Sequence, residues 1–175
     1  MMPQRNIRPQ VTLRALEPED LELVYQIEND RENWREGVTN VPYSRYALRQ
    51  FIADSTCDIY RDGQVRLVVQ DGQQPVGFAD LVNFSPTHLR AELGLIIFPS
   101  HRHRGYATAA LQAMRHYAHT VLHLHQLYSI VGKSNEYSLR MFRALGLQPE
   151  ATLCDWLFDG HGYQDALLVR IPLGD

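Results

Sequence analysis

Residues 93–110 read LGLIIFPSHRHRGYATAA, and this stretch decides the fold of the chain. The apolar run over 93–98 indicates a buried strand that ends at Pro99, because proline cannot donate to a strand ladder. After Gly105, apolar residues recur at helical spacing over 106–122 and predict a long amphipathic helix. The stretch therefore predicts a strand that runs through a short basic turn into a helix.

The turn between these elements has the chemistry of an anion site. A helix N-terminus presents unpaired N–H groups and about half a positive elementary charge. Arg102 and Arg104 add cationic side chains to it, and His103 adds a hydrogen-bond donor. Gly105 allows the backbone to approach a ligand closely. On its own the pattern also fits an ordinary turn with solvated basic residues, so the rest of the chain has to decide between the two.

Further elements follow from hydrophobic periodicity, caps and turn residues. In chain order they are a strand at 11–16, helices at 20–30 and after Ser44, strands at 64–70, 75–83 and 90–98, the helix at 106–122, a strand at 126–131, a helix from Asn135 to Gly146, and strands at 152–158 and 163–170. Asp71-Gly72 and Asp159-Gly160 are expected to form hairpin turns. We predict a single domain over 1–175, with its core at about 11–170 and a mixed α/β fold around one sheet.

The composition excludes several classes of function. Hydrophobic residues make up 45% and charged residues 21% of the 175 residues, and the formal net charge is −3. Such a charge gives no broad cationic surface, so we expect no nucleic-acid partner. No signal peptide and no run of about 18 apolar residues is present, so we expect no membrane partner and a cytoplasmic protein. Cys57 and Cys154 lack metal-ligand spacing.

The motif Arg102-x-x-Gly105-x-Ala107 resembles the pyrophosphate motif of the GNAT superfamily of N-acetyltransferases. Residues 135–147, NEYSLRMFRALGL, resemble the last helix of that family. The resemblance runs over about 11–170 and is nearest to the spermidine/diamine acetyltransferase branch, through segments 91–92, 120–128 and 159–165. It implies a mostly antiparallel central sheet flanked by helices, with acetyl-CoA as the co-substrate of an acetyltransferase.

The resemblance also implies where acetyl-CoA binds. In the family, the fourth strand splays from the fifth and frees backbone N–H groups for the thioester oxygen and the pantetheine arm. The expected contacts with acetyl-CoA are Leu95, Ile96, Ile97, Phe98, Arg102, His103, Arg104, Gly105, Tyr106, Ala107, Thr108, Asn135, Ser138 and Phe142.

Two positions bear on proton transfer. An alkylammonium has a pKa near 10.4, so freeing the amine at pH 7 costs about 4.6 kcal/mol. Glu92 is the expected base or water relay, because the resembled branch carries an acidic residue there; an ordinary surface glutamate is the alternative. Many relatives protonate the leaving thiolate with a tyrosine, and this chain has Phe142 at that position, where a core role is equally compatible.

The resemblance also implies that the acceptor binds between the first two helices and the last hairpin, and these segments are rich in carboxylates. The expected contacts are Glu28, Trp34, Glu36 and Tyr43. Carboxylates and aromatic rings suit a polyamine or another small amine. A protein N-terminus or lysine, an amino sugar, a solvated acidic surface, and a non-catalytic sensor of acetyl-CoA or an amine remain open. Self-association is open as well.

No metal is expected. His119 and His123 have the i, i+4 spacing of metal ligands but no acidic neighbour, so they indicate a solvated helix face. Tyr128 and Trp156 are expected in the core.

Overall fold

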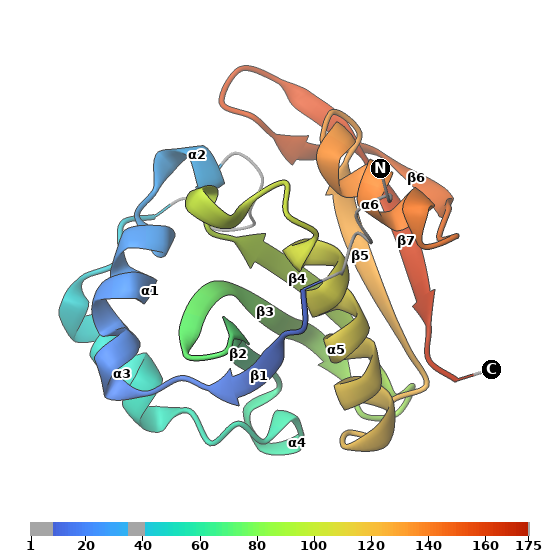
Figure 1. The fold of residues 1–175 in the computed structure, drawn as a ribbon. Helices are drawn as coiled ribbons and strands as arrows, with labels where there is room; N and C mark the ends of the chain where they lie inside the picture. Colours follow the sequence, from blue (N-terminus) through green and yellow to red (C-terminus); the bar gives the residue numbers. More distant parts are fainter. Residues whose placement is uncertain (1–8, 35–40, 175) are drawn as a thin grey trace, which may run out of the picture.

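The computed structural model describes residues 9–34 and 41–174, which form one seven-stranded sheet (Figure 1). The strands are β1 (Thr12–Ala15), β2 (Val65–Asp71), β3 (Gln74–Ser85), β4 (Arg90–Ile97), β5 (Gln126–Gly132), β6 (Pro149–Phe158) and β7 (Tyr163–Pro172). Their order in the sheet is β1-β2-β3-β4-β5-β7-β6. Neighbouring strands are antiparallel except for the parallel pair β4 and β5. The predicted mostly antiparallel sheet is confirmed.

Helices cover both faces of this sheet. They are α1 (Leu21–Glu28), α2 (Arg31–Trp34), α3 (Arg45–Asp54), α4 (Ile59–Asp62), α5 (Tyr106–Thr120) and α6 (Glu136–Ala144), with 3₁₀ turns η1 (Pro18–Asp20) and η2 (Pro99–His101). The long helices occur where the sequence predicts them. The single turns α2 and α4 were not predicted, because four residues are too few to show a period.

Two hydrophobic clusters result, one on each face. The larger joins α5 and α6 to the sheet through residues such as Leu67, Leu111 and Phe142. The smaller joins α1 and α3 to the opposite face through residues such as Val24 and Val68. Successive strand residues point to opposite faces, so the central strands are apolar almost throughout.

Local signals in the sequence set the helix ends. The Ser44 hydroxyl accepts a hydrogen bond from the Ala47 N–H at 3.1 Å and begins α3. The Asn135 side chain accepts from the Ser138 N–H at 3.0 Å and begins α6. Gly146 follows α6 with φ +74°, a left-handed conformation that glycine adopts without strain. The first hairpin turns at residues 72–73, one position later than predicted.

Two predictions about single residues are wrong, the place of Trp156 and the shared helix face of His119 and His123. Trp156 is not in the core, because 55% of its surface is exposed on β6. His119 and His123 do not share a helix face, because α5 ends at Thr120 and His123 lies beyond it with φ +55°.

Among residues 9–34 and 41–174, no three histidine, cysteine or acidic side chains gather as a metal site.

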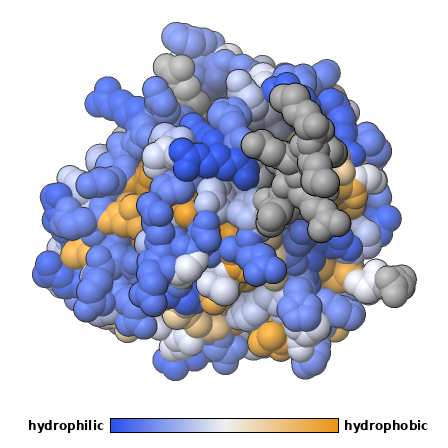
Figure 2. Space-filling view, in the orientation of Figure 1, coloured by the Kyte–Doolittle hydropathy of each residue, from blue (hydrophilic) through white to orange (hydrophobic). Residues whose placement is uncertain are grey.

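None of the helices in the described segments is long and apolar enough to span a bilayer. Figure 2 shows one face covered mostly by hydrophilic residues, with hydrophobic residues only in small groups.

Candidate active site

The two parallel strands at the centre of the sheet separate part-way along their length. β4 and β5 pair from Arg90 opposite Gln126 to Glu92 opposite Tyr128, and no further. Where they part, the buried Ser129 hydroxyl donates a hydrogen bond to the Leu93 carbonyl at 2.8 Å. A gap therefore opens between the ends of these strands. Ser129 was missed by the sequence analysis, since one serine in an apolar strand gives no distinctive signal.

Backbone groups of β4 border this gap. A Cβ on Gly77 of β3 would lie 2.2 Å from the Ile96 carbonyl oxygen, so that oxygen faces β3. Along a strand, backbone groups alternate between its two edges. Leu95 and Ile97 consequently present their backbone to the gap, and the Ile97 carbonyl accepts a hydrogen bond from Arg102 Nε at 3.1 Å. Of the residues 95–98, which were expected to offer backbone groups to acetyl-CoA, Leu95 and Ile97 are thus the two whose backbone faces the gap.

Phe98, one of the residues expected to contact acetyl-CoA, packs in the core and lies outside the cleft lining. Its N–H donates to the Val76 carbonyl at 2.9 Å, on the β3 side. Its ring meets the Phe78 ring edge-on at 5.2 Å, in the cluster beneath α1 and α3. Only 7% of Phe98 is exposed. The residue closes the core where the strand ends.

The basic turn leads from the gap into α5. Gly105 has φ +86° and precedes the 15-residue helix, so the N–H groups of its first turn face the end of the gap. Arg102 and Arg104 are both exposed, but Arg102 contacts the strand end and lines the cleft, whereas Arg104 lies outside the cleft lining. The Tyr106 hydroxyl donates to Asp71 at 2.5 Å, and this hydrogen bond raises the pKa of Tyr106. The turn is therefore tied to the β2–β3 hairpin.

A cleft of about 1440 Å³ lies at the gap and is lined by residues of α1 and α3 on one face of the sheet and of α5 and α6 on the other. Pockets for single small ligands are usually about 300–1,000 Å³, so this cleft has room for two substrates. The sequence-predicted residues that line it are Glu28, Tyr43, Glu92, Leu95, Ile96, Ile97, Arg102, His103, Gly105, Tyr106, Ala107, Thr108, Asn135, Ser138 and Phe142. Glu36 and the side chain of Trp34 lie outside the described residues.

Phe142 lies in the core and also borders the cleft. It is only 3% exposed and packs in the larger core with Leu139. It also lines the cleft beside the gap, as does Ser138 in the preceding turn of α6. Its ring therefore gives this part of the cleft an apolar wall that carries no proton donor.

Charged residues gather in the cleft on the α1 and α3 face. Arg66 of β2 donates two hydrogen bonds to Asp80 of β3, both at 2.7 Å, and also contacts the Glu28 carboxylate of α1. Burial lowers the pKa of Arg66, but the carboxylates of Asp80 and Glu28 outweigh it and raise that pKa. Arg66 and Asp80 were missed, although charges in the middle of two apolar strands are a signal that could have found them.

Glu92 faces the same side of the sheet as this cluster. In the β3–β4 register Asp80 lies opposite Gly94, and Val82 lies opposite Glu92. One Glu92 carboxylate oxygen accepts a hydrogen bond from the Asn83 amide at 2.9 Å. The carboxylate is therefore oriented at the point where β4 and β5 begin to separate.

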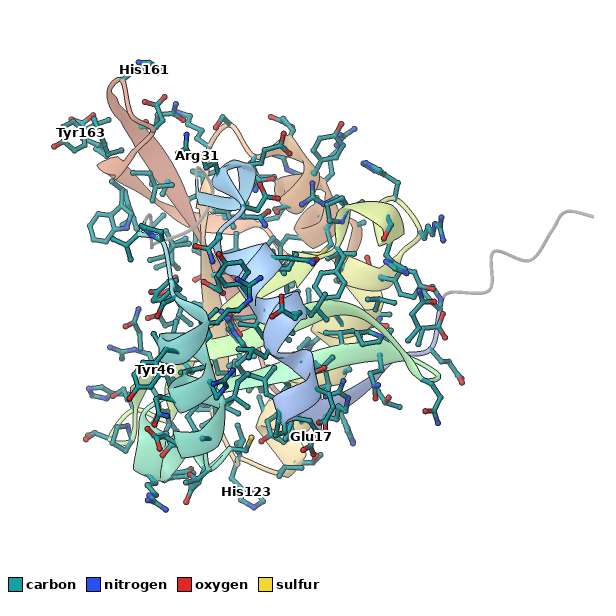
Figure 3. The ribbon with its side chains drawn as sticks, turned by 90° about the vertical axis from the view of Figure 1, so that its left-hand side faces the viewer. Glu17, Arg31, Tyr46, His123, His161 and Tyr163 are labelled. Atoms are coloured by element: carbon teal, nitrogen blue, oxygen red, sulfur yellow. The ribbon has the colours of Figure 1, made fainter. Side chains whose placement is uncertain are left out.

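Two further segments that were predicted to bind the amine substrate also line the cleft, one at Tyr43 and one at the β6–β7 hairpin. Tyr43 is held by Asn29, which accepts from its N–H at 2.9 Å and donates to its carbonyl at 3.1 Å. Asp159 lines the cleft at the β6–β7 hairpin, where hydrogen bonds from the Gly162 and His161 N–H groups lower its pKa. Figure 3 shows this hairpin reaching past the sheet, with His161 and Tyr163 on the side of Arg31.

Comparison with known proteins agrees with this geometry. The family model of the acetyltransferase (GNAT) domain matches residues 10–148, most of the chain. The chain belongs to the GNAT acetyltransferase family. This membership confirms the predicted family and the predicted acetyl-CoA-dependent acetyltransferase.

Individual GNAT relatives cover nearly the whole chain. A spermidine N(1)-acetyltransferase of Escherichia coli (strain K12) is 34% identical over 161 residues, 92% of this chain and 85% of the relative. A crystal structure of spermidine N-acetyltransferase from Vibrio cholerae, in complex with CoA and spermine, superimposes with a TM-score of 0.83. It is 29% identical and covers 94% of this chain and 96% of that chain. A dodecameric structure of the Vibrio cholerae enzyme gives a TM-score of 0.79 at 29% identity, covering 94% of both chains.

Proposed function

We propose that this GNAT protein transfers the acetyl group of acetyl-CoA to a primary amine of a polyamine. One observation carries the proposal: the gap between β4 and β5 opens directly onto a carboxylate-rich part of the cleft. Glu28, Asp80 and Glu92 line that part, with Arg66 as the cation among them. A chain of ammonium groups would balance this excess of carboxylates. The spermidine acetyltransferase relatives support the same class of acceptor.

The residues around the gap suit a thioester as the second substrate. The thioester supplies an activated acetyl group that an amine can attack directly. Backbone N–H groups of Leu95 or Ile97 are available to stabilise the negative charge that develops on its carbonyl oxygen. The N-terminus of α5 and the basic turn favour a pyrophosphate at the other end of the gap.

Glu92 is proposed to remove the proton from the attacking ammonium, through a water molecule. The Asn83 amide holds one carboxylate oxygen, so the other can accept a proton from that water. Asp80 and Glu28 hold the cationic acceptor beside Glu92, and Arg66 keeps both carboxylates in place. General-base assistance of this kind contributes about 10²- to 10⁴-fold to a rate.

The departing thiolate is proposed to take its proton from solvent. Phe142 offers no donor, but a thiol pKa near 8.5 makes the thiolate a tolerable leaving group. The rate of acetyl transfer is then lower than with a positioned acid, without being abolished.

Free-thiol release from acetyl-CoA across a panel of amines tests the function. The panel holds spermidine, spermine, short diamines, monoamines, aminoglycosides and N-terminal or lysine peptides. Turnover is expected with the polyamines, and turnover with peptides alone would overturn the polyamine assignment. If calorimetry shows binding of CoA and a polyamine while no amine releases thiol, the protein is a sensor and not an enzyme.

Self-association is proposed as well. β6 lies at the edge of the sheet, and Trp156 and Phe158 of β6 and Tyr163 of the adjoining β7 are exposed by 55%, 60% and 69%. Exposed aromatic patches at sheet edges are typical of contact surfaces, and the Vibrio cholerae relative forms a dodecamer. Light scattering coupled to gel filtration is expected to give a mass above 20.2 kDa, and a monomer at assay concentration would contradict this.

A further inference from the structure

A second and smaller pocket lies along α5, apart from the cleft. It has a volume of about 240 Å³ and is lined by Gln112, Arg115, His116 and His119 of α5 and by Leu173 and Gly174, which follow β7. None of these six residues lines the cleft. The four α5 residues are spaced at i, i+3, i+4 and i+7, so they share one face of the helix. We call this pocket the α5 pocket.

Arg115 is the fixed positive charge of the α5 pocket. Its Nη2 donates a hydrogen bond to the Pro172 carbonyl at 3.0 Å, which ties the guanidinium to the end of β7. Its Nε is buried and has no hydrogen-bond partner among residues 9–34 and 41–174, and within the same residues Arg115 forms no ion pair. A cation that loses contact with water is normally paired with an anion, because the loss of hydration costs free energy. Arg115 therefore lacks an anionic partner in this part of the chain.

The neighbouring side chains provide further hydrogen-bond donors. His116 and His119 are exposed, and neither ring makes a hydrogen bond or an ion pair within the described segments. The His119 ring lies against Gly174, since a Cβ on that glycine would be 3.4 Å from the ring Cε1. Imidazole N–H groups and the Gln112 amide can each donate to an oxygen, and arginine can bind two oxygens of one anion. None of the described residues that line the α5 pocket is acidic, so the pocket favours an anion.

We propose that the α5 pocket binds a phosphate group, with Arg115 as its counterion and His116 and His119 as further donors. Four donor side chains from one helix face suit a tetrahedral anion with several acceptor oxygens better than a carboxylate with two. The volume is below the 300–1,000 Å³ that is usual for a drug-sized ligand, which favours an ion or a small phosphate ester. Because the α5 pocket shares no residue with the cleft, this inference does not depend on the proposed acetyl transfer.

Titration with inorganic phosphate, followed by NMR of the histidine side chains, tests the site locally. At constant pH and ionic strength, the signals of His116 and His119 are expected to shift and to saturate, whereas the signal of His123 should not. His103 reports separately on phosphate at the basic turn before α5. Shifts of His116 and His119 that do not saturate, or that match the shift of His123, would overturn the proposal.

Variants show which side chains hold the phosphate. Arg115→Gln is expected to weaken phosphate about tenfold, since a charge-assisted contact is lost, and the exposed Arg143→Gln on α6 is the matched control. His119→Gln replaces an exposed side chain and should weaken phosphate about threefold with His116 as the reporter, because one hydrogen bond to the anion is lost. His123→Gln is its control. Wild-type affinity in both Arg115→Gln and His119→Gln would refute the site.

Three anions at equal ionic strength identify the ligand chemistry. Inorganic phosphate and glycerol 3-phosphate are both expected to bind. Tighter binding of the ester would support a phosphate group on a larger molecule, and tighter binding of inorganic phosphate would support the free ion. Acetate should bind at least about tenfold more weakly, because it offers fewer oxygens and one charge. Acetate that binds as tightly as phosphate would overturn the phosphate assignment in favour of a carboxylate.

Discussion

Glu92 is the single residue on which the proposed proton transfer depends. It lies where β4 and β5 separate, with one oxygen held by Asn83. Glu92→Gln keeps the shape and an oxygen for Asn83 but removes the basic oxygen. We expect kcat/KM for spermidine to fall about 10²-fold, within the range of general-base catalysis, with little change in CoA affinity.

Kinetics at several pH values check this prediction. With Glu92 as the base, raising the pH should partly restore the Glu92→Gln rate, because more of the amine is already deprotonated. Asn83→Ala should give a smaller loss, since it only frees the carboxylate to move. Wild-type kcat/KM in the Glu92→Gln enzyme would show that another group acts as the base.

At Phe142, in contrast, we predict a substitution that increases kcat. Its ring is 3% exposed yet borders the cleft. Phe142→Tyr would place a hydroxyl at this border, and we expect kcat to rise about tenfold if that hydroxyl protonates the thiolate. Phe142→Leu is the control for altered packing and should not raise kcat. A folded Phe142→Tyr variant with unchanged kcat would show that protonation of the thiolate does not limit the rate.

Among the secondary-structure elements, β3 and β4 meet most closely at Gly77. A Cβ there would lie 2.2 Å from the Ile96 carbonyl oxygen, which neither strand can accommodate without moving. We expect Gly77→Ala to lower the free energy of unfolding by about 3 kcal/mol, at the upper end for overpacking. Gly94→Ala is the control, because its Cβ would meet only Asp80 at 3.7 Å.

Urea denaturation of both variants provides the measurement. Gly94→Ala should unfold within about 1 kcal/mol of wild type, since glycine in a strand is itself unfavourable. Similar losses in the two variants would mean that contact with the Ile96 carbonyl does not decide the effect.

The connection from β1 to η1 gives a pH-dependent contribution to stability. The buried Asp20 accepts two hydrogen bonds from Arg14, at 2.6 and 2.8 Å, and these lower its pKa below the usual value. The unfolded chain therefore binds the proton more readily. The resulting stabilisation of the folded protein is present above the pKa of Asp20 in the unfolded chain, about 3.9. It is lost as the pH falls through the lower pKa that Asp20 has in the folded protein.

Asp20→Asn is accordingly expected to lose about 2 kcal/mol of unfolding free energy at pH 7, the range for hydrogen bonds to charged groups. The difference from wild type should shrink as the pH approaches the native pKa of Asp20. Urea denaturation from pH 7 to pH 3 checks both statements, and a difference that stays constant over this range would contradict the assignment.

The sequence predicted these elements well where the signal was local. Ser44 and Asn135 cap helices through their own side chains, so their roles could be read from neighbouring residues. The separation of β4 from β5 was implied only by family resemblance, because strand pairing depends on residues far apart in the chain. Trp156 was misplaced because an aromatic residue in a strand pattern gives no information on whether the strand lies at an edge.

At the scale of the whole molecule, one gap in one sheet serves two substrates. The face with α5 carries the basic turn, and the face with α1 and α3 carries the carboxylates. Arg66 joins that second group by contacting both Glu28 and Asp80. Such a cluster could not be predicted as a unit, since its members come from three elements separated by up to 52 positions.

The carboxylates of this cleft should also govern how acceptor affinity depends on salt. Salt screens charges over about 30 Å at 0.01 M but only about 8 Å at 0.15 M, so attraction between the cleft and a polycation weakens between these concentrations. We expect the KM for spermidine to rise about fivefold over this range at saturating acetyl-CoA, and the KM for a monoamine to rise less, because it carries one charge. Steady-state kinetics with both amines measures the difference. Equal salt dependence would mean that recognition rests on apolar contacts along the chain of the amine, with Glu28 and Asp80 serving only to hold Arg66.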